Sequence, residues 1–209
     1  GDKKPGSGVL QFMDDGAMIA LRDAVTLMIT LSDNTATNLV LDHLGTTHEG
    51  RMRAVNGFLA GQCLTRTKLL NRLYSSGTKQ QTPESIRYGI GVTTPAEMVV
   101  LLERLFTRTL VDSASCAAMI GVLGEQFYGD MIPRLLPAGE CARFSVAHKT
   151  GSLNEVKADV GLVLSDRVDF AIAIFVDKHP DHQDDAGNGA VALGAYVARA
   201  VWNHFTGMS

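Results

Sequence analysis

The sequence predicts an α+β fold in which a block of helices precedes a small antiparallel sheet and a final helix. Apolar residues recur at helical spacing through much of residues 17–136, segments rich in Val, Ile and Phe follow over residues 144–177, and helical spacing returns over residues 190–205. We expect residues 1–137 to form a mainly helical subdomain and residues 138–209 to form the sheet and its covering helix, together as one structural unit. A chain of 209 residues, of which 45% are hydrophobic, can bury a sizeable core.

The first helix is predicted over residues 17–31, where an apolar stripe ends at the Ser-Asp-Asn tripeptide of residues 32–34. The stripe consists of Leu21, Val25, Met28 and Ile29. A second stripe begins at Ala36 and ends before Gly45, a residue type that commonly terminates helices. The tripeptide is expected to cap this second helix, because each of its side chains can accept a hydrogen bond from an N–H group of the first turn.

The middle of the chain gives weaker signals. Residues 46–93 are less regular, and residues 75–83 have the composition of an exposed loop. Residues 94–97, Thr-Pro-Ala-Glu, form a capping-box pattern with proline at the first helical position, so a helix is predicted to begin there. Further helices are predicted over residues 113–123 and 131–136.

Residues 144–152, F-S-V-A-H-K-T-G-S, are typical of a half-buried strand that ends in a polar tip. Residues 149–152 bring together an ammonium, hydroxyls and exposed backbone N–H groups, which is a place to hold an anion. Residues 158–165 and 169–177 are predicted to form an antiparallel hairpin. The second of these is a near-continuous apolar run, so we expect it to be covered on both faces, with the helix of residues 190–205 as one cover.

Composition excludes several classes of protein. The net charge is −3, and there is no basic patch with interleaved aromatic residues to bind nucleic acid. No apolar run approaches the ~20 residues of a membrane-spanning helix. The chain opens on a polar stretch with neither an initiator Met nor a signal peptide, so a processed or cut start is expected. Three cysteines without C-x-x-C spacing, predicted to be buried free thiols, argue against a disulfide framework and a thiolate zinc site: Cys63, Cys116 and Cys141.

Ser-Asp-Asn at residues 32–34, followed by Lys-Thr-Gly at residues 149–151 on a strand, resembles the penicillin-recognising serine hydrolases, and class A β-lactamases most closely. The resemblance covers nearly the whole chain. It implies a β-lactamase/transpeptidase-like fold, with a helical subdomain and an antiparallel sheet flanked by a C-terminal helix. It also implies that this chain is N-terminally incomplete, because the family's S-x-x-K motif should precede Ser-Asp-Asn and residues 1–31 contain no such pattern.

The resemblance assigns catalytic roles to two residues. Ser32 would pass a proton toward the leaving nitrogen, and Lys149 would supply positive charge close to Ser32. Asp33 would brace the loop, and Asn71, from the E-x-x-L-N arrangement of the family, would stand near the site as a structural residue.

The same resemblance assigns substrate binding to residues of both motifs. Asn34 would hydrogen-bond the substrate's amide side chain. Thr150 would bind the substrate carboxylate, and Gly151, the next residue of the strand, would belong to the same substrate-binding segment. The backbone N–H of Ser152 would form half of an oxyanion hole, which stabilises charge that develops in the tetrahedral state. No metal ligand and no cofactor are implied.

Two departures from the family pattern affect the chemistry. Residues 76–79, Ser-Gly-Thr-Lys, fit the letters of S-x-x-K but follow Ser-Asp-Asn in a loop-like context, so we do not expect the nucleophile there. Thr67 stands where E-x-x-L-N has its Glu, and threonine cannot act as a carboxylate base, so release of an acyl-enzyme should be slow. Glu84 could compensate, although its spacing gives no support.

The predicted function is acyl transfer on a β-lactam, through a serine nucleophile outside this chain, in a periplasmic or secreted protein. Alternatives are an enzyme of the penicillin-binding type that recognises a D-alanyl peptide, and a catalytically inactive ligand-binding module of the same fold. Without the first segment an exposed sheet edge is expected, and a homo-oligomer could form through it.

Three features beyond the two motifs have more than one interpretation. Residues 178–189 are rich in His and Asp and could suggest a metal site, but their composition is more typical of a solvated connection into the last helix. Lys157 and Asp159 could add charge to the anion pocket or form an exposed cross-strand pair. His148 is expected to pack or to form a hydrogen bond rather than to titrate in catalysis.

Overall fold

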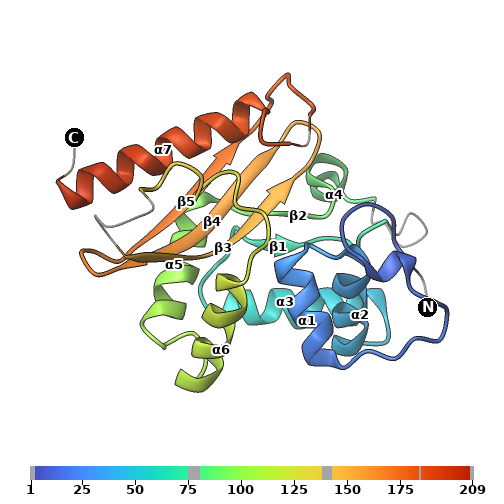
Figure 1. Cartoon of the computed structure of the whole chain (residues 1–209). Helices are drawn as coiled ribbons and strands as arrows, with labels where there is room; N and C mark the ends of the chain where they lie inside the picture. Colours follow the sequence, from blue (N-terminus) through green and yellow to red (C-terminus); the bar gives the residue numbers. More distant parts are fainter. Residues whose placement is uncertain (1–2, 75–80, 138–142, 184, 208–209) are drawn as a thin grey trace. The chain divides into compact units, whose positions relative to one another are not determined.

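The computed structural model describes residues 3–74, 81–137, 143–183 and 185–207. It confirms the α+β class, with seven α-helices among the described residues and a three-stranded antiparallel sheet late in the chain (Figure 1). The chain divides into two compact units, Gly1–Glu97 and Met98–Ser209, which are described separately below as unit 1 and unit 2. The predicted subdomain boundary at residues 137/138 falls just before the first long strand, whereas the compact units divide near the start of a helix.

Unit 1 begins with a short 3-10 helix, η1 (Leu10–Phe12), and a packed helix pair, α1 (Leu21–Thr30) and α2 (Asn34–Leu44). The predicted helix over residues 17–31 therefore forms, although it starts four residues later, and α2 ends just before Gly45 as expected. The three elements share one small apolar cluster, whose buried members are Leu10, Ala24 and Ala36.

The rest of unit 1 contains two helices that the sequence analysis missed. These are α3 (His48–Gly61) and α4 (Pro83–Tyr88), each of which begins after a threonine cap. A two-stranded antiparallel ladder, β1 (Lys68–Leu69) with β2 (Gly91–Val92), connects this region to α5 (Pro95–Phe106). Residues 75–80 of the predicted loop lie outside the described residues.

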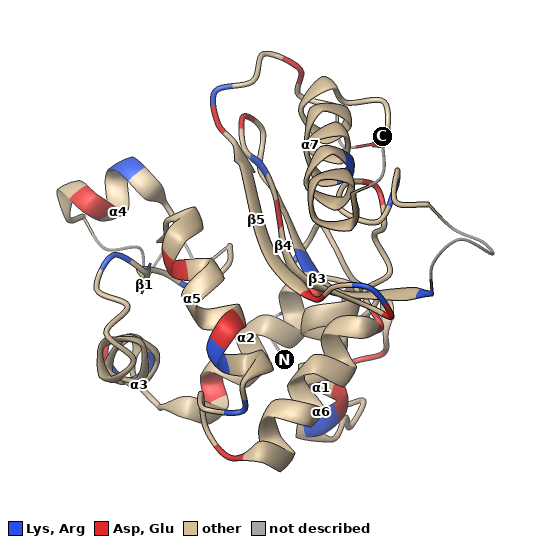
Figure 2. Ribbon diagram, turned by 90° about the vertical axis from the view of Figure 1, so that its left-hand side faces the viewer, with Lys and Arg blue, Asp and Glu red and all other residues tan. Residues whose placement is uncertain are grey.

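Unit 2 contains the later turns of α5, then α6 (Ser113–Gly124), β3 (Phe144–Ser152), β4 (Lys157–Ser165), β5 (Phe170–Val176) and α7 (Gly189–Thr206). The strands are antiparallel in the order β3-β4-β5. Charged residues are sparse along the strands and along α7 (Figure 2). The predicted strand, hairpin and closing helix are all confirmed.

The two faces of this sheet pack against different helices. On one face, Val163 and Ile172 join a core with the fully buried Trp202 of α7. On the other face, Ala147 and Leu162 pack with residues of α5 and α6. The sheet is therefore covered on both sides, which agrees with the apolar character of the last strand.

The helix predicted over residues 131–136 does not form; these residues make successive turns. Pro133 lies inside the segment and lacks the N–H group that a helix interior requires. Leu136 N instead donates to Pro133 O at 3.2 Å, and Ile132 N donates to a side chain of β4. The apolar residues that suggested a helix, Met131, Ile132 and Leu136, are buried in the unit 2 core.

Candidate functional site

Ser-Asp-Asn occupies the junction between α1 and α2 in unit 1. Ser32 has a left-handed backbone conformation, with φ at 51°. Asp33 is the N-cap of α2, and its Oδ1 accepts a hydrogen bond from Ala36 N at 2.8 Å. The tripeptide thus makes the sharp turn that lets α2 begin at Asn34, only four residues after α1 ends at Thr30.

Residues 5–10 of unit 1 run along this junction and are hydrogen-bonded to it. Asp33 Oδ2 accepts hydrogen bonds from Val9 N at 2.7 Å and Leu10 N at 2.9 Å. Asn34 Nδ2 donates to Pro5 O at 2.7 Å. Gly8 lies against the carboxyl group with φ at +101°, and a Cβ there would lie 2.2 Å from Asp33 Cγ. Asp33, only 1% exposed, therefore holds the junction and the preceding segment together.

Lys-Thr-Gly ends strand β3 in unit 2. Lys149 is half-buried, on the strand face that packs against α6, and its Nζ donates to Thr150 O at 2.6 Å. Burial lowers the pKa of Lys149 to about 8, while the nearby charge of Asp159 opposes that shift. Thr150 is half-buried, and Gly151 and Ser152 are exposed at the strand end. The segment thus presents an ammonium, a hydroxyl and two exposed strand-end residues within four positions.

A buried polar network lies behind this strand end. His148 Nδ1 and Asp159 Oδ1 are hydrogen-bonded at 2.8 Å, and Asp159 Oδ2 accepts from Ile132 N at 3.0 Å. Lys157 Nζ donates to Ser152 Oγ at 2.6 Å. His148, Lys157 and Asp159 are 3%, 4% and 0% exposed, so the interpretation of the last two as an exposed cross-strand pair is wrong. The expected hydrogen bond of His148 is confirmed.

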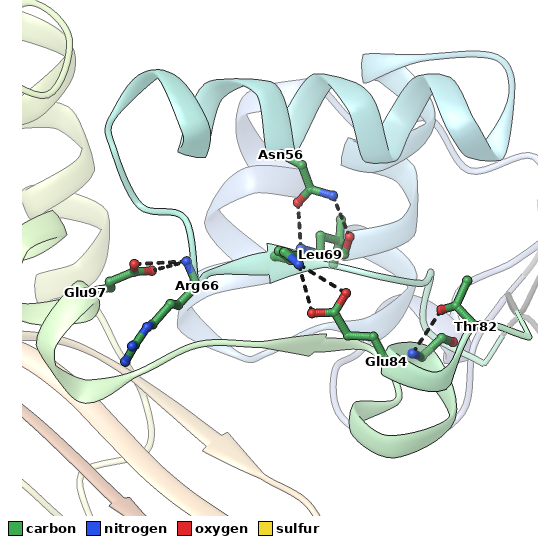
Figure 3. A network of polar contacts seen from close by, with 8 residues as sticks. Asn56, Arg66, Leu69, Thr82, Glu84 and Glu97 are labelled. Carbon is green, nitrogen blue, oxygen red and sulfur yellow. Dashed lines mark hydrogen bonds and ion pairs between the residues drawn. The ribbon is translucent and has the colours of Figure 1, made fainter.

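Sequence reasoning missed a carboxylate beside Thr67. Thr67 Oγ1 donates to Glu97 Oε2 at 2.6 Å. Arg66 N donates to both oxygens of Glu97, at 2.9 and 3.1 Å (Figure 3). These hydrogen bonds, first the one from Thr67, lower the pKa of Glu97. The capping-box pattern did identify Glu97, and its N–H donates to Thr94 Oγ1 at 3.2 Å, but its side chain reaches β1 instead of completing the box.

Asn71 and Glu84 both hold unit 1 together. Asn71 is buried, and its Nδ2 donates to Ser85 Oγ at 2.7 Å and to Gly89 O at 2.5 Å, which ties α4 to the chain after β1. Glu84 forms an ion pair with Lys68 at 2.9 Å (Figure 3). A cavity of about 470 Å³ lies beside this pair, lined by residues that include Met52, Asn56 and Leu70.

The remaining sequence-based candidates have plainer surroundings. Cys116 is buried as predicted, but Cys63 is exposed, because it follows the end of α3 in a left-handed conformation; Cys141 lies outside the described residues, as do residues 76–79. Among the described residues no group of three His, Cys, Asp or Glu side chains gathers to hold a metal. Asp181 instead accepts hydrogen bonds from the backbone N–H groups of Gln183 and Gly189. Within the same residues, no helix is long and apolar enough to cross a membrane.

The candidate site thus has two parts, residues 32–34 in unit 1 and residues 149–152 in unit 2, each positioned by its own unit. The sequence model of the "Beta-lactamase enzyme family" matches residues 1–205. Among solved structures, a β-lactamase from Sphaerobacter thermophilus DSM 20745 is 32% identical, with a TM-score of 0.76, and the match covers 94% of this chain and 68% of that one. No curated protein matches the chain.

Two further structures resemble the fold at lower identity. PBP-A is 22% identical with a TM-score of 0.73, over 96% of this chain and 68% of its own. A class A β-lactamase from Bacteroides cellulosilyticus DSM 14838 is 21% identical with a TM-score of 0.72, over 90% of this chain and 65% of its own. The chain therefore spans about two thirds of the length of the structures that it matches.

Proposed function

Since this chain belongs to the β-lactamase enzyme family, we propose that it carries the proton-transfer and substrate-binding part of a serine hydrolase that opens β-lactams. The observation that carries the proposal is the end of β3, where the half-buried Lys149 ammonium stands next to the Thr150 hydroxyl. This arrangement suits a substrate carboxylate, because a charged donor and a neutral donor can bind its two oxygens. By the same family resemblance, we propose a periplasmic or secreted location.

The proposed reaction is acyl transfer to a serine that this chain does not itself contain. The serine oxygen attacks the lactam carbonyl carbon, the carbon–nitrogen bond of the ring breaks, and the serine proton ends on the ring nitrogen. Ser32 passes this proton, and the N–H of Ser152 stabilises the oxyanion. Asn34 orients the amide side chain, and water later releases the ring-opened product.

The test is intact-protein mass after incubation with penicillin G, quenched in acid at several times, with penicillin depletion measured in the same tube. The 209-residue chain alone should gain no adduct and should consume no penicillin. A version extended upstream to include an S-x-x-K segment should gain the mass of one penicillin. An adduct on the chain alone would mean that its nucleophile lies within these residues and would overturn that part of the proposal.

Two variants of the extended protein test the role of Lys149. Lys149→Ala should slow acylation by about 100-fold or more, since it removes the charge that binds the carboxylate and assists proton transfer. Arg143→Ala removes an exposed positive charge just before the other end of β3 and should leave the rate unchanged. Equal acylation by the unmodified protein and Lys149→Ala would contradict the assigned role.

A specific observation favours the penicillin-binding alternative, in which the acyl-enzyme persists. Thr67 cannot act as a base, and the nearest carboxylate, Glu97, is occupied by Thr67 and the Arg66 N–H. The double variant Thr67→Glu, Glu97→Gln introduces a carboxylate without placing two negative charges together, and it should shorten the lifetime of the adduct. Glu97→Gln alone is the matched control and should leave the adduct long-lived.

A further inference from the structure

Strand β3 is joined to two other segments by a single buried carboxylate. Asp159 of β4 is hydrogen-bonded to His148 of β3 through Oδ1, at 2.8 Å, and accepts from Ile132 N through Oδ2, at 3.0 Å. Asp159 is fully buried, and Ile132 belongs to the apolar core of unit 2. Movement of β3 at His148, the residue before Lys-Thr-Gly, relative to this core must therefore break a buried hydrogen bond, which is costly.

The contact between His148 and Asp159 depends on a glycine. His148 lies opposite Gly161 in the β3–β4 ladder. A Cβ at Gly161 would lie 2.5 Å from His148 Cβ and 2.9 Å from Ala147 O, so no other residue fits without spreading the strands. The close approach gives the imidazole a fixed place beside Asp159, two residues before Gly161 in β4.

Asp159 is also placed to act on the charge of Lys149. It lies directly opposite Thr150, the residue after Lys149. Its charge therefore acts on the Lys149 ammonium through the strand and not by a direct contact. Among the described residues, the charged or titratable groups on elements packed against β3 are Lys157 and Asp159 on β4, Cys116 on α6, Glu97, Glu103 and Arg104 on α5, and Tyr196, Arg199 and His204 on α7.

Only one of these groups is a buried anion. Glu97 is bound to Thr67 and Arg66, Glu103 is exposed, and Cys116 packs in a separate apolar cluster. Burial lowers the pKa of Lys149, and the charge of Asp159 acts in the opposite direction. The geometry and the electrostatics therefore point to the same residue.

We propose that Asp159 is a positioning residue for Lys-Thr-Gly: through His148 and the Ile132 amide it fixes the end of β3, and its negative charge stabilises the Lys149 ammonium. The importance of this for catalysis rests on the proposed function, whereas the effect on Lys149 itself does not. Asp159 thus offsets part of the energetic cost of burying an ammonium at the strand end.

The test is the pH titration of the Lys149 side chain in the full 209-residue chain, followed by NMR of isotope-labelled lysine and assigned with Lys149→Arg. Asp159→Asn keeps the size of the side chain and removes its charge. It should move the Lys149 midpoint to lower pH by roughly half a unit or more, about a threefold change in the protonation equilibrium. Asp166→Asn is the matched control: Asp166 is exposed beyond the far end of β4, and this variant should leave the midpoint unchanged.

Amide hydrogen exchange in the same samples tests the positioning role. Protection at the end of β3 should fall in Asp159→Asn and stay constant in Asp166→Asn. An unchanged Lys149 midpoint in a folded Asp159→Asn chain would overturn the proposal.

If Asp159→Asn does not fold, His148→Gln keeps the carboxylate and removes the imidazole. Its Lys149 midpoint should equal or exceed that of the unmodified chain, because the charge of Asp159 remains while the strand end becomes more exposed. A midpoint below that of the unmodified chain would overturn the proposal. None of these readings requires a β-lactam, so a shifted midpoint without acylation of the extended protein would count against the proposed function alone.

Discussion

Among the described residues each unit has one almost completely buried aspartate, Asp33 within Ser-Asp-Asn and Asp159 near Lys-Thr-Gly, and the two are held in different ways. Asp33 in unit 1 accepts hydrogen bonds from three backbone N–H groups, those of Ala36, Val9 and Leu10. Asp159 in unit 2 accepts from one backbone N–H and shares its other oxygen with His148. The first carboxylate is held by fixed backbone dipoles at a helix start, and the second by an ionisable ring.

The difference separates a structural role from a chemical one. The partners of Asp33 cannot change their charge, so this residue determines where the chain turns and little else. Asp159 is hydrogen-bonded to His148 and lies opposite Thr150, the residue after Lys149. Its negative charge acts on the Lys149 ammonium, which the proposed chemistry uses. Burial alone would not have distinguished the two.

The largest expected effect is that of Asp33→Ala. It leaves three backbone N–H groups without their acceptor and removes the cap of α2, so it should lower the local free energy of unfolding by about 4 kcal/mol. Hydrogen exchange of the α2 amides measures this. Asp33→Asn can still cap the helix through Oδ1 but cannot accept from Val9 and Leu10, so it should lose about half as much; losses equal to those of Asp33→Ala would mean that the cap contact with Ala36 contributes little.

Lys149→Met should raise the free energy of unfolding, whereas Asp33→Ala should lower it. The folded pKa of Lys149, about 8, lies below its ordinary value of 10.5, so the unfolded chain binds more protons between these values and stability rises with pH across that window. Replacing the ammonium with a thioether should therefore stabilise unit 2 by up to about 3 kcal/mol at pH 7. The pH-dependent part of this gain should fade between pH 8 and 10.5.

Urea unfolding followed by the fluorescence of Trp202, the only tryptophan and a member of the unit 2 core, reports this change. If Lys149→Met instead lost stability at pH 7, the contacts of Lys149 in the fold would more than offset the cost of burying its ammonium. Lys149 would then stabilise the fold, in contrast to a residue retained for its chemistry at the expense of stability.

The parts of the fold that sequence predicted are those with regular apolar spacing. Helices α1, α2 and α7 each bury an apolar stripe, and the three long strands carry runs of apolar residues toward two covered faces; both patterns are visible locally. Helix α3 was missed because it buries only Met52, so its apolar residues show no clear stripe. Its cap, Thr47, was the available signal. The helix prediction for residues 131–136 was wrong because apolar residues in a run of turns can be buried in a core just as those of a helix can.

The candidate site also has parts that the local sequence predicts and parts that it does not. Ser-Asp-Asn and Lys-Thr-Gly are contiguous and were found by their letters, within elements of the expected type. The contact of Thr67 with Glu97 joins residues 30 positions apart, and that of His148 with Asp159 joins residues 11 apart. Both depend on how β1 and β3 are placed by their neighbours, which local patterns do not encode.

Gly161→Ala tests the strand contact that distinguishes Asp159 from Asp33. The added methyl group meets His148 Cβ and the backbone of Ala147, and neither can move away as a flexible side chain would. We expect a loss of about 2 kcal/mol in the free energy of unfolding of unit 2, by Trp202 fluorescence in urea. Gly121→Ala, on α6 where a Cβ meets nothing within 4 Å, is the control and should not destabilise.

The smallest expected effect concerns Glu97, a half-buried carboxylate that is more accessible than Asp33 and Asp159. Its pKa is lowered by the hydrogen bond from Thr67, so its contribution to stability is present above the ordinary value of 4.5 and is lost as the pH falls through the lower, folded value. Glu97→Gln should therefore be slightly less stable than the unmodified chain at pH 6, and the two should converge toward pH 3. Exchange of the Arg66 amide, which donates to Glu97, follows this locally. A difference that persisted at pH 3 would mean that the shape of the side chain, rather than its charge, holds Thr67 in place.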